Sequence, residues 1–467
     1  MSNPLFTPEI RMLLEEQNNE GLAAFCDSLH PATVAEALDD EFTPEQVWEV
    51  ISHSNIRTQA SIFEYLPPPR QVEMAEHARP QMGQLLGKMS HDDRVDLLRR
   101  LPTRVTEAIM RLVDEADRRD IATLFQYGEN TVGALMTTDY AWLPGTLTAA
   151  EAIDQLRQQA PDRETIYYIY VLDDATRRPD GSIAPRRLLG VVSLRDLILA
   201  PRHSLVRELM ETELATLHFN DDKAEVTQLF SRYDFIAAPV VDDRFGLLGI
   251  VTHDDVLDVV QAEATEDLQR QAGVGPIEGD YLDAKFGAVW YSRVKWLAIL
   301  FVMQMGTINV MAHYESQLNR LAVMLVFIPL CLSVGGNAGS QAATLVTRAL
   351  ALEQIRLADW ARVFRRELLM AASLAACLGV LSVLRTYFLT PDKVLAAVPP
   401  GMLWSLIWAV TISIMGICLT GAVLGAMLPL VARKLGGDPA LMSSPFIATL
   451  SDVLGIVIYF NVVMMFF

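Results

Sequence analysis

The chain has 467 residues, and its 57 acidic and 38 basic side chains give a formal charge of −19. From Ala284 onward the sequence holds 13 Lys and Arg against 7 Asp and Glu, which leaves 25 basic and 50 acidic residues before it. A uniform soluble domain is excluded, because the long apolar stretches and most of the acidic residues lie in different halves of the chain. A nucleic-acid partner is disfavoured, since such an acidic half repels phosphate and attracts cations.

Residues 1–130 are expected to form a helical domain of repeated helix pairs. Leu-Pro steps at Leu66-Pro67 and Leu101-Pro102 lie thirty-five residues apart, His30-Pro31 precedes them at a similar distance, and periodic apolar residues follow each. Within residues 88–98, Asp92 and Asp96 are four residues apart and share one helix face. Like charges at this spacing are unfavourable unless a cation bridges them.

Residues 131–253 contain an internal repeat. The segment 132–156 parallels 206–230, 164–174 parallels 233–243, and 190–198 parallels 249–257. Each copy predicts a short strand, a helix, two apolar strands and a closing helix. A polar insertion in the first copy, residues 175–187, predicts a loop. The pattern resembles a tandem pair of CBS domains.

The CBS resemblance suggests a nucleotide. In that family a Ser or Thr three residues before an Asp often meets the ribose of adenine nucleotides, and the pairs here are Ser193 with Asp196 and Thr252 with Asp255. ATP is therefore a candidate ligand. A helix N-cap explains Ser193 and Thr252 at least as well, so both interpretations stay open.

Residues 254–283 predict a connecting helix and a linker. Six acids fall within fourteen residues, opposite an apolar face, as in an amphipathic helix. They are Asp254, Asp255, Asp258, Glu263, Glu266 and Asp267. A solvated acidic face explains this pattern, and so does a cation-binding face. The position between an acidic domain and membrane helices favours the second, because movement there can open or close a pore.

Residues 284–467 predict a transmembrane domain of five helices. The apolar runs are Trp290–Ala312, Leu321–Val346, Leu368–Leu389, Met402–Leu430 and Leu441–Phe466. Each reaches the ~20 residues that cross a hydrocarbon core of about 30 Å. No signal peptide is expected, because the first 20 residues lack an apolar core preceded by basic residues.

Basic residues predict the orientation in the cell membrane. Three of them (Arg320, Arg385 and Lys393) fall on one side of the five runs, and ten on the other. The ten are Lys285, Arg293, Lys295, Arg348, Arg356, Arg362, Arg365, Arg366, Arg433 and Lys434. This asymmetry places the acidic amino-terminal half in the cytoplasm.

Asp452 is the acidic residue that lies well inside an apolar run. A carboxyl in the bilayer is costly and usually faces a bundle interior or a water path. A neutral or hydrogen-bonded carboxyl between helices is one explanation, and a cation ligand in a pore is the other.

The second run favours the pore. Gly335, Gly336 and Gly339 are expected to expose backbone carbonyls, and Asn337, Ser340, Gln341 and Thr344 add neutral polar groups. Carbonyls, hydroxyls and one carboxylate suit hard cations such as Mg²⁺ or Ca²⁺. Close helix packing explains the glycines but not the neighbouring amides. Because one carboxylate holds a dication weakly, we expect a homodimer with the pore on its two-fold axis.

These segments together resemble the MgtE family of magnesium channels and transporters along nearly the whole chain. The most specific matches are residues 249–268, 335–350 and 438–460. The resemblance implies a multi-domain fold: an all-α N-domain, an α/β CBS pair, a connecting helix and five transmembrane helices. It also implies a homodimeric, Mg²⁺-selective channel in the lipid bilayer.

The resemblance also assigns site residues. Asp452 corresponds to the pore carboxylate, Ala448 offers a carbonyl one turn earlier, and Gly336, Asn337 and Thr344 belong to the matching second-helix motif. Ser444 stands where members often have Asn, which puts a direct side-chain ligand there in doubt. Regulatory Mg²⁺ sites match Asp92, Asp96, Asp222, Asp234, Asp255, Asp258, Glu263, Glu266 and Asp438.

The sequence therefore predicts Mg²⁺ import that cytoplasmic Mg²⁺ shuts off by bridging carboxylates of different domains. Two alternatives stay open: a gradient-coupled carrier of divalent cations, and a non-transporting membrane sensor of metal or nucleotide. An enzyme is disfavoured, because the sequence contains no evident nucleophile–base set or phosphate-cradling loop.

Overall fold

A computed structural model describes residues 5–39, 41–76, 80–173, 185–277, 281, 284–314, 322–388, 390, 398 and 401–467. Most of the polar insertion at 175–187, together with Arg320 and Lys393, lies outside these residues. The chain forms two compact units, Met1–Gln261 and Ala262–Phe467.

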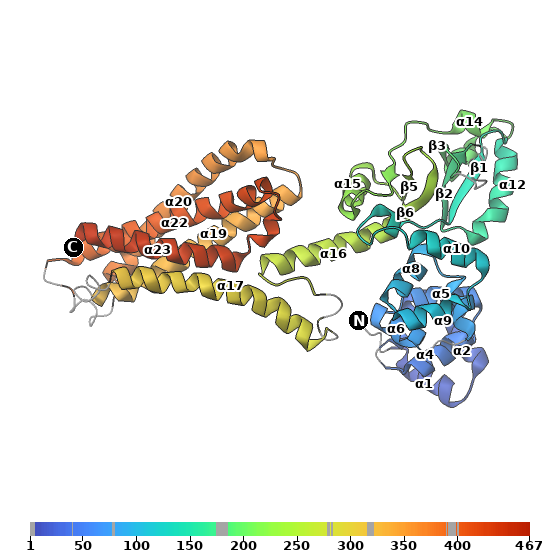
Figure 1. The fold of residues 1–467 in the computed structure, drawn as a ribbon, viewed down its shortest axis with the longest axis horizontal. Coiled ribbons are helices and arrows are strands. Elements are labelled where there is room, and N and C mark those ends of the chain that lie inside the picture. Colours follow the sequence, from blue (N-terminus) through green and yellow to red (C-terminus); the bar gives the residue numbers. More distant parts are fainter. Residues whose placement is uncertain are drawn as a thin grey trace. The chain divides into compact units, whose positions relative to one another are not determined.

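The first part of the amino-terminal unit is helical (Figure 1). Its helices are α1 (Thr7–Glu15), α2 (Asn19–Ser28), α3 (Pro31–Leu38), α4 (Pro44–Ser52), α5 (Ile56–Glu64), α6 (Pro68–Glu76), α7 (Pro80–Leu86), α8 (His91–Arg100), α9 (Thr103–Met110) and α10 (Glu115–Leu124). The recurring prolines mark helix starts: Pro31 is the first residue of α3, Pro67 directly precedes α6, and Pro102 precedes α9. The first helical position suits proline, because its amide has no partner within the helix.

Two copies of a small β-sheet unit follow, as the internal repeat predicts. The first contains α11 (Val132–Leu135), β1 (Tyr140–Pro144), α12 (Ala149–Gln159), η1 (Ala160–Asp162), β2 (Thr165–Leu172), β3 (Leu188–Ser193) and α13 (Leu194–Leu199). The second contains α14 (Val206–Leu209), β4 (Leu217–His218), α15 (Lys223–Tyr233), β5 (Ala237–Val241), β6 (Leu247–Thr252) and α16 (His253–Gln271). In each copy the first strand pairs parallel with the second, and the second antiparallel with the third.

One apolar core joins the amino-terminal helices to the second sheet copy. Leu98 of α8 and Leu124 of α10 belong to the same buried cluster as Phe230 of α15, Val240 of β5 and Val256 of α16. The first copy has a separate core. The shared core fixes the start of α8 and the start of α16 within one rigid packing, so acidic residues on both helices have defined positions.

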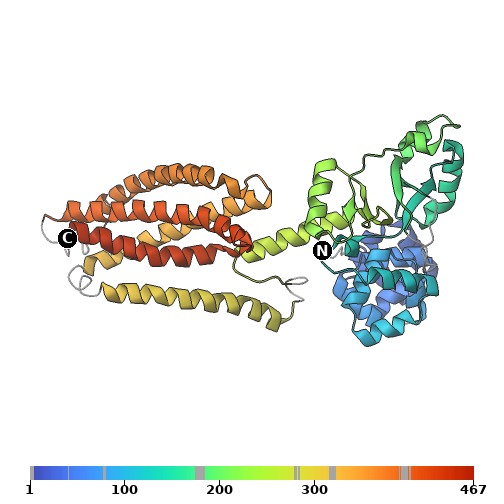
Figure 2. The same ribbon diagram turned by 45° about the horizontal axis from the view of Figure 1, so that its top comes forward.

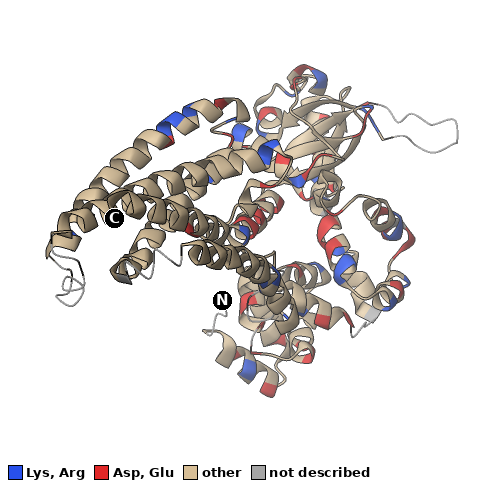
Figure 3. Ribbon diagram, turned by 60° about the vertical axis from the view of Figure 1, so that its left-hand side comes forward, with Lys and Arg blue, Asp and Glu red and all other residues tan. Residues whose placement is uncertain are grey.

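The second unit contains five helices, within the described residues, that are long and apolar enough to cross a membrane. They are α17 (Phe286–His313), η2 with α19 (Ala322–Phe327, Ile328–Ala351), α20 (Trp360–Phe388, after η3, Leu357–Asp359), α22 (Leu403–Lys434) and α23 (Ser444–Phe466, after η4, Pro439–Leu441). Figure 2 shows these helices side by side, and Figure 3 shows few charged residues along them.

The third membrane helix begins earlier than predicted. Because α20 starts at Trp360, Arg362, Arg365 and Arg366 lie on its first turns, whereas the sequence placed them in a loop. The charge asymmetry behind the orientation is unchanged by this correction, since these residues remain at the same helix end.

Candidate functional site

The glycines of α19 serve close helix packing rather than an opened backbone. The helix is continuous from Ile328 to Ala351, so the expectation that these glycines expose carbonyls is wrong. A Cβ on Gly335 would lie 2.6 Å from Ile417 Cγ2, and one on Gly339 would lie 2.9 Å from Gly421 O. Gly336 approaches α23, where a Cβ would lie 3.2 Å from Ala448 Cβ. Small residues let these helices approach closely.

Four polar residues of α19 lie on its exposed face. Ser333, Asn337, Gln341 and Thr344 are all exposed in this single chain. Asn337 Nδ2 donates to Ser333 Oγ at 3.3 Å, and Thr344 Oγ1 donates to Ser340 O at 2.9 Å. A polar face is costly against lipid, so another surface, protein or water, is expected to cover it.

Asp452 is partly buried in the middle of α23. The side chain of Gln304, on α17, donates a hydrogen bond to its carboxylate. The sequence prediction did not name Gln304. Its position as an amide inside an otherwise apolar run was the available signal.

The start of α16 meets the start of α8 through a pair of carboxyl groups. The carboxyl groups of Asp92 and Asp255 lie within hydrogen-bond reach of each other. Asp92 Oδ1 is buried and accepts no hydrogen bond from a donor among the described residues. Burial, then the charge of Asp255, raises the pKa of Asp92 well above its usual value. Burial raises the pKa of Asp255 to about 6.

Further acids complete this group. Burial raises the pKa of Glu64 to about 8, although Ser90 N donates to Glu64 Oε1 at 2.7 Å. Burial and then the charges of Asp254 and Asp255 raise the pKa of Glu164 to about 7. We call the group of Glu64, Asp92, Asp93, Glu164, Asp254 and Asp255 the carboxylate cluster. It draws residues from α5, α8, the segment before β2, and α16.

The carboxylate cluster fits a hard dication. Burial, and then the charges of neighbouring acids, raises the pKa values of Glu64, Asp92, Asp93, Glu164 and Asp255. A divalent ion would remove that penalty, and carboxylate oxygens are its preferred ligands. The sequence predicted Asp92 and Asp255 but missed Glu64 and Glu164, because no local spacing connects α5 or the segment before β2 to α8.

The distal end of α16 carries a different arrangement, inside the second unit. The Arg270 guanidinium pairs with both Glu266 and Asp438. Asp438 also accepts from Ala440 N at 2.8 Å and so caps η4. Glu266 and Asp438, two residues predicted to bind Mg²⁺, therefore both pair with the positive charge of Arg270.

The remaining predicted acids have varied surroundings. Asp222 caps α15 by accepting from Ala224 N at 3.0 Å, and Asp234 ends that helix in a left-handed conformation. Asp96 lies 3.9 Å from Arg100. Asp258 is exposed on α16, and Glu263 is half-buried there. Asp96 and Asp258 border the carboxylate cluster: after burial, the charge of Asp96 raises the pKa of Asp93, and the charge of Asp254 raises the pKa of Asp258.

The two nucleotide motifs lie at helix starts, before α13 and before α16. Ser193 Oγ accepts from Asp196 N at 3.0 Å at the start of α13 and lies 2.5 Å from Asp196 Oδ2. Thr252 Oγ1 lies 2.5 Å from carboxylate oxygens of both Asp254 and Asp255. The capping interpretation is confirmed for Ser193. Capping by the Thr252 side chain and adenine-nucleotide binding stay predictions.

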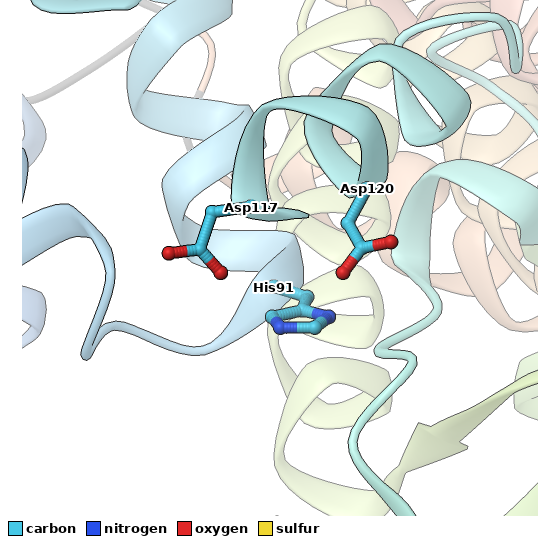
Figure 4. A group of neighbouring side chains, drawn as sticks. All are labelled: His91, Asp117 and Asp120. Carbon is cyan, nitrogen blue, oxygen red and sulfur yellow. The ribbon is translucent and has the colours of Figure 1, made fainter. Parts of the chain in front are cut away.

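A second group of possible metal ligands, His91, Asp117 and Asp120, has ligand atoms within 4.8 Å of one another (Figure 4). Arg94 is 2% exposed, with Nη1 lying 3.3 Å from Asp117 Oδ1. Burial, then the charges of Arg94 and Arg163, lowers the pKa of His91 to about 3. Because a buried guanidinium already balances this group, it is better explained as an ion-pair network than as a metal site.

Family models match most of the chain. A model described as a divalent cation transporter matches residues 328–462, an MgtE intracellular N domain matches 29–130, and CBS domains match 132–203 and 206–262. The chain is 36% identical over 453 residues, 96% of each protein, to a magnesium transporter MgtE of Thermus thermophilus. It is 33% identical over 347 residues to one from Enterococcus faecalis, covering 74% of this chain and 71% of that protein.

Among solved structures, the cytosolic domain of the Mg²⁺ channel MgtE in complex with ATP covers 54% of this chain and 99% of its own. It is 34% identical, with a TM-score of 0.48.

Proposed function

Because this multi-pass membrane chain belongs to the MgtE family of divalent cation transporters, we propose that it carries Mg²⁺ across the cell membrane and that cytoplasmic Mg²⁺ shuts it off. Relatives that match 96% and 74% of the chain are named magnesium transporters. The proposal extends that cargo to this protein.

Asp452 supports the transport step. It is a carboxylate in the middle of a membrane helix, where such a group usually borders a water path. Mg²⁺ gives up water reluctantly, so a single carboxylate per chain suits an ion that keeps most of its hydration shell. The ion would bind through its waters to Asp452 and to carbonyls near Ala448.

The exposed polar face of α19 supports a homodimer. Ser333, Asn337, Gln341 and Thr344 would be covered if a second copy faced the first across a two-fold axis. Two Asp452 carboxylates would then share one cation. We assign Gly336 to packing that holds α19 against α23, and Asn337 and Thr344 to the pore wall.

The carboxylate cluster is the observation that carries the gating half of the proposal. Asp92, whose buried Oδ1 accepts no hydrogen bond from a donor among the described residues, lies within a group of acids that a dication would stabilise. Because the cluster connects α16 to the amino-terminal helices, ions bound there would hold α16 in one arrangement. Moving the equilibrium between the open and closed arrangements from 1:99 to 99:1 takes ~5.5 kcal/mol of difference in ion-binding free energy between them. Several weak sites can supply that together. In this proposal the amino-terminal half lies in the cytoplasm, where it senses the imported ion.

The test is Mg²⁺ current in excised membrane patches against cytoplasmic Mg²⁺ concentration. We expect current at low cytoplasmic Mg²⁺ and closure as the concentration rises. Current that is independent of cytoplasmic Mg²⁺ would contradict the gating. A flux that depends on a proton or sodium gradient would favour the carrier alternative, and absence of flux in proteoliposomes would favour a sensor.

A further inference from the structure

Three side-chain hydrogen bonds join α17 to α23 along their length. Trp296 Nε1 donates to Ser443 Oγ at 3.1 Å, Gln304 donates to Asp452, and Asn461 Nδ2 donates to the Tyr314 hydroxyl at 3.1 Å. The first and third pairs are separated by the same 147 residues. The residues of the middle pair are separated by one residue more. Because the separation is nearly constant, the two helices run parallel in one register.

One face of α17 is apolar and exposed. Leu297, Phe301, Val302 and Met305 of α17 are exposed in the chain, as expected for side chains that face lipid. Gly306 lies beside α23, where a Cβ would be 3.8 Å from Val453 Cγ2. Smooth apolar surfaces permit several registers, whereas an unpaired amide in hydrocarbon is costly. The polar pairs therefore fix which residue of α17 faces Asp452.

The chemistry of the middle pair differs from that of the outer two. A carboxylate has two oxygens with about four lone-pair directions, and it can accept several hydrogen bonds. An amide that donates to one of them fixes the orientation of the carboxylate and leaves the other directions to a cation or its waters. Groups that orient a ligand in this way typically change metal affinity by about 10–100-fold when they are removed.

We propose that Gln304 is a positioning residue for the conducted ion, because it holds the Asp452 carboxylate in the orientation that receives a hydrated dication. This inference rests on the proposed role of Asp452 as the pore carboxylate. It assigns to α17, which carries no acidic residue in its membrane segment, a direct part in ion affinity.

The test uses the full-length protein in lipid bilayers. Gln304→Met keeps the length of the side chain and removes both amide groups. We expect the half-saturating external Mg²⁺ concentration to rise about tenfold, while the cytoplasmic Mg²⁺ concentration that closes the protein stays unchanged. Trp296→Phe is the matched control, because it removes a hydrogen bond between the same helices without touching Asp452. It should leave the half-saturating concentration at the wild-type value.

Two outcomes would overturn the proposal. One is wild-type half-saturation in Gln304→Met, and the other is an equal change in Trp296→Phe, which would reduce Gln304 to helix packing. If Gln304→Met does not fold, Gln304→Asn, whose shorter amide cannot reach, replaces it with the same expectation. Asp452→Asn distinguishes the pore role of Asp452 from the positioning role of Gln304. Wild-type current in Asp452→Asn would contradict the pore role. Lost current in Asp452→Asn, together with wild-type half-saturation in Gln304→Met, would contradict only the positioning role.

Discussion

The two units of the chain contain carboxylates in opposite settings. In the amino-terminal unit, six acids from four segments lie close together, and burial, then the charges of neighbouring acids, raises the pKa values of Glu64, Asp92, Glu164 and Asp255. In the membrane unit, Asp452 stands apart from other acids and accepts a hydrogen bond from a neutral amide. A crowded group gains much from binding a dication and is suited to retain it, whereas an isolated carboxylate is suited to release it. In the proposed function, this is the difference between a sensor and a conduction path.

The largest effect is expected at the isolated carboxylate. Asp452→Asn should reduce Mg²⁺ flux in proteoliposomes by at least about 100-fold, since the amide keeps the shape and removes the charge that attracts the ion. Elution of the variant in size-exclusion chromatography should match the wild type. Flux within a factor of two of wild type would show that conduction does not need this charge.

The next effect tests the crowded side. Replacing Asp255, Asp258, Glu263 and Glu266 with Asn or Gln should raise the cytoplasmic Mg²⁺ concentration for half closure by more than about tenfold, because ions then lose part of their preference for the closed arrangement. Patch-clamp current at high Mg²⁺ is the measurement. The matched control changes four exposed acids elsewhere to Gln (Glu15, Glu16, Glu20 and Glu107). An equal change in the control would mean that net charge, not the acidic face of α16, sets the response.

A pH dependence follows from the raised pKa values. The pKa of Glu64 is about 8 in the folded protein against an ordinary 4.5, and that of Glu164 is about 7. An acid with a raised folded pKa contributes stability below its unfolded pKa and loses it as pH rises through the folded value. In EDTA, hydrogen-exchange protection of residues 88–98, corrected for intrinsic rates, should therefore fall by about tenfold from pH 5 to pH 8.

Added Mg²⁺ should restore this protection, and the restoration should be larger at pH 8 than at pH 6, because protons compete with the ion for the same carboxylates. Protection that rises with pH in EDTA, or a Mg²⁺ effect of equal size at both pH values, would argue against a crowded carboxylate cluster in the folded protein.

The smallest effect concerns the internal cation at the distal end of α16. Arg270→Gln should raise the half-closing Mg²⁺ concentration about threefold. Its partly exposed ion pairs with Glu266 and Asp438 contribute about 0.2–1 kcal/mol each to the arrangement of α16 in the closed form, and the variant loses both. Arg270→Lys should change it less. The double variant Arg270→Glu with Asp438→Arg restores an ion pair with exchanged charges. If this pair matters, the half-closing Mg²⁺ concentration should move back toward the wild-type value. No such return would mean that other contacts of Arg270 cause the change.

Local sequence signals predicted much of this architecture. The spacing of proline steps gave the helical amino-terminal domain, the internal repeat gave the two sheet copies, and run length gave the five membrane helices. Asp452 was visible because a charge in an apolar run stands out without any tertiary information. The glycines of α19 were misjudged, because a glycine that opens the backbone and one that admits a neighbouring helix look alike in a sequence.

By itself, the sequence determined which segments enter the membrane and which carry charge, since both depend on composition over about 20 residues. Only the tertiary structure decided which charges meet. Glu64, Asp92 and Asp255 are brought together by a core shared between the amino-terminal helices and the second sheet copy. Gln304 reaches Asp452 because two helices distant in the sequence run parallel in one register. Such meetings depend on packing between distant segments, which no local pattern encodes.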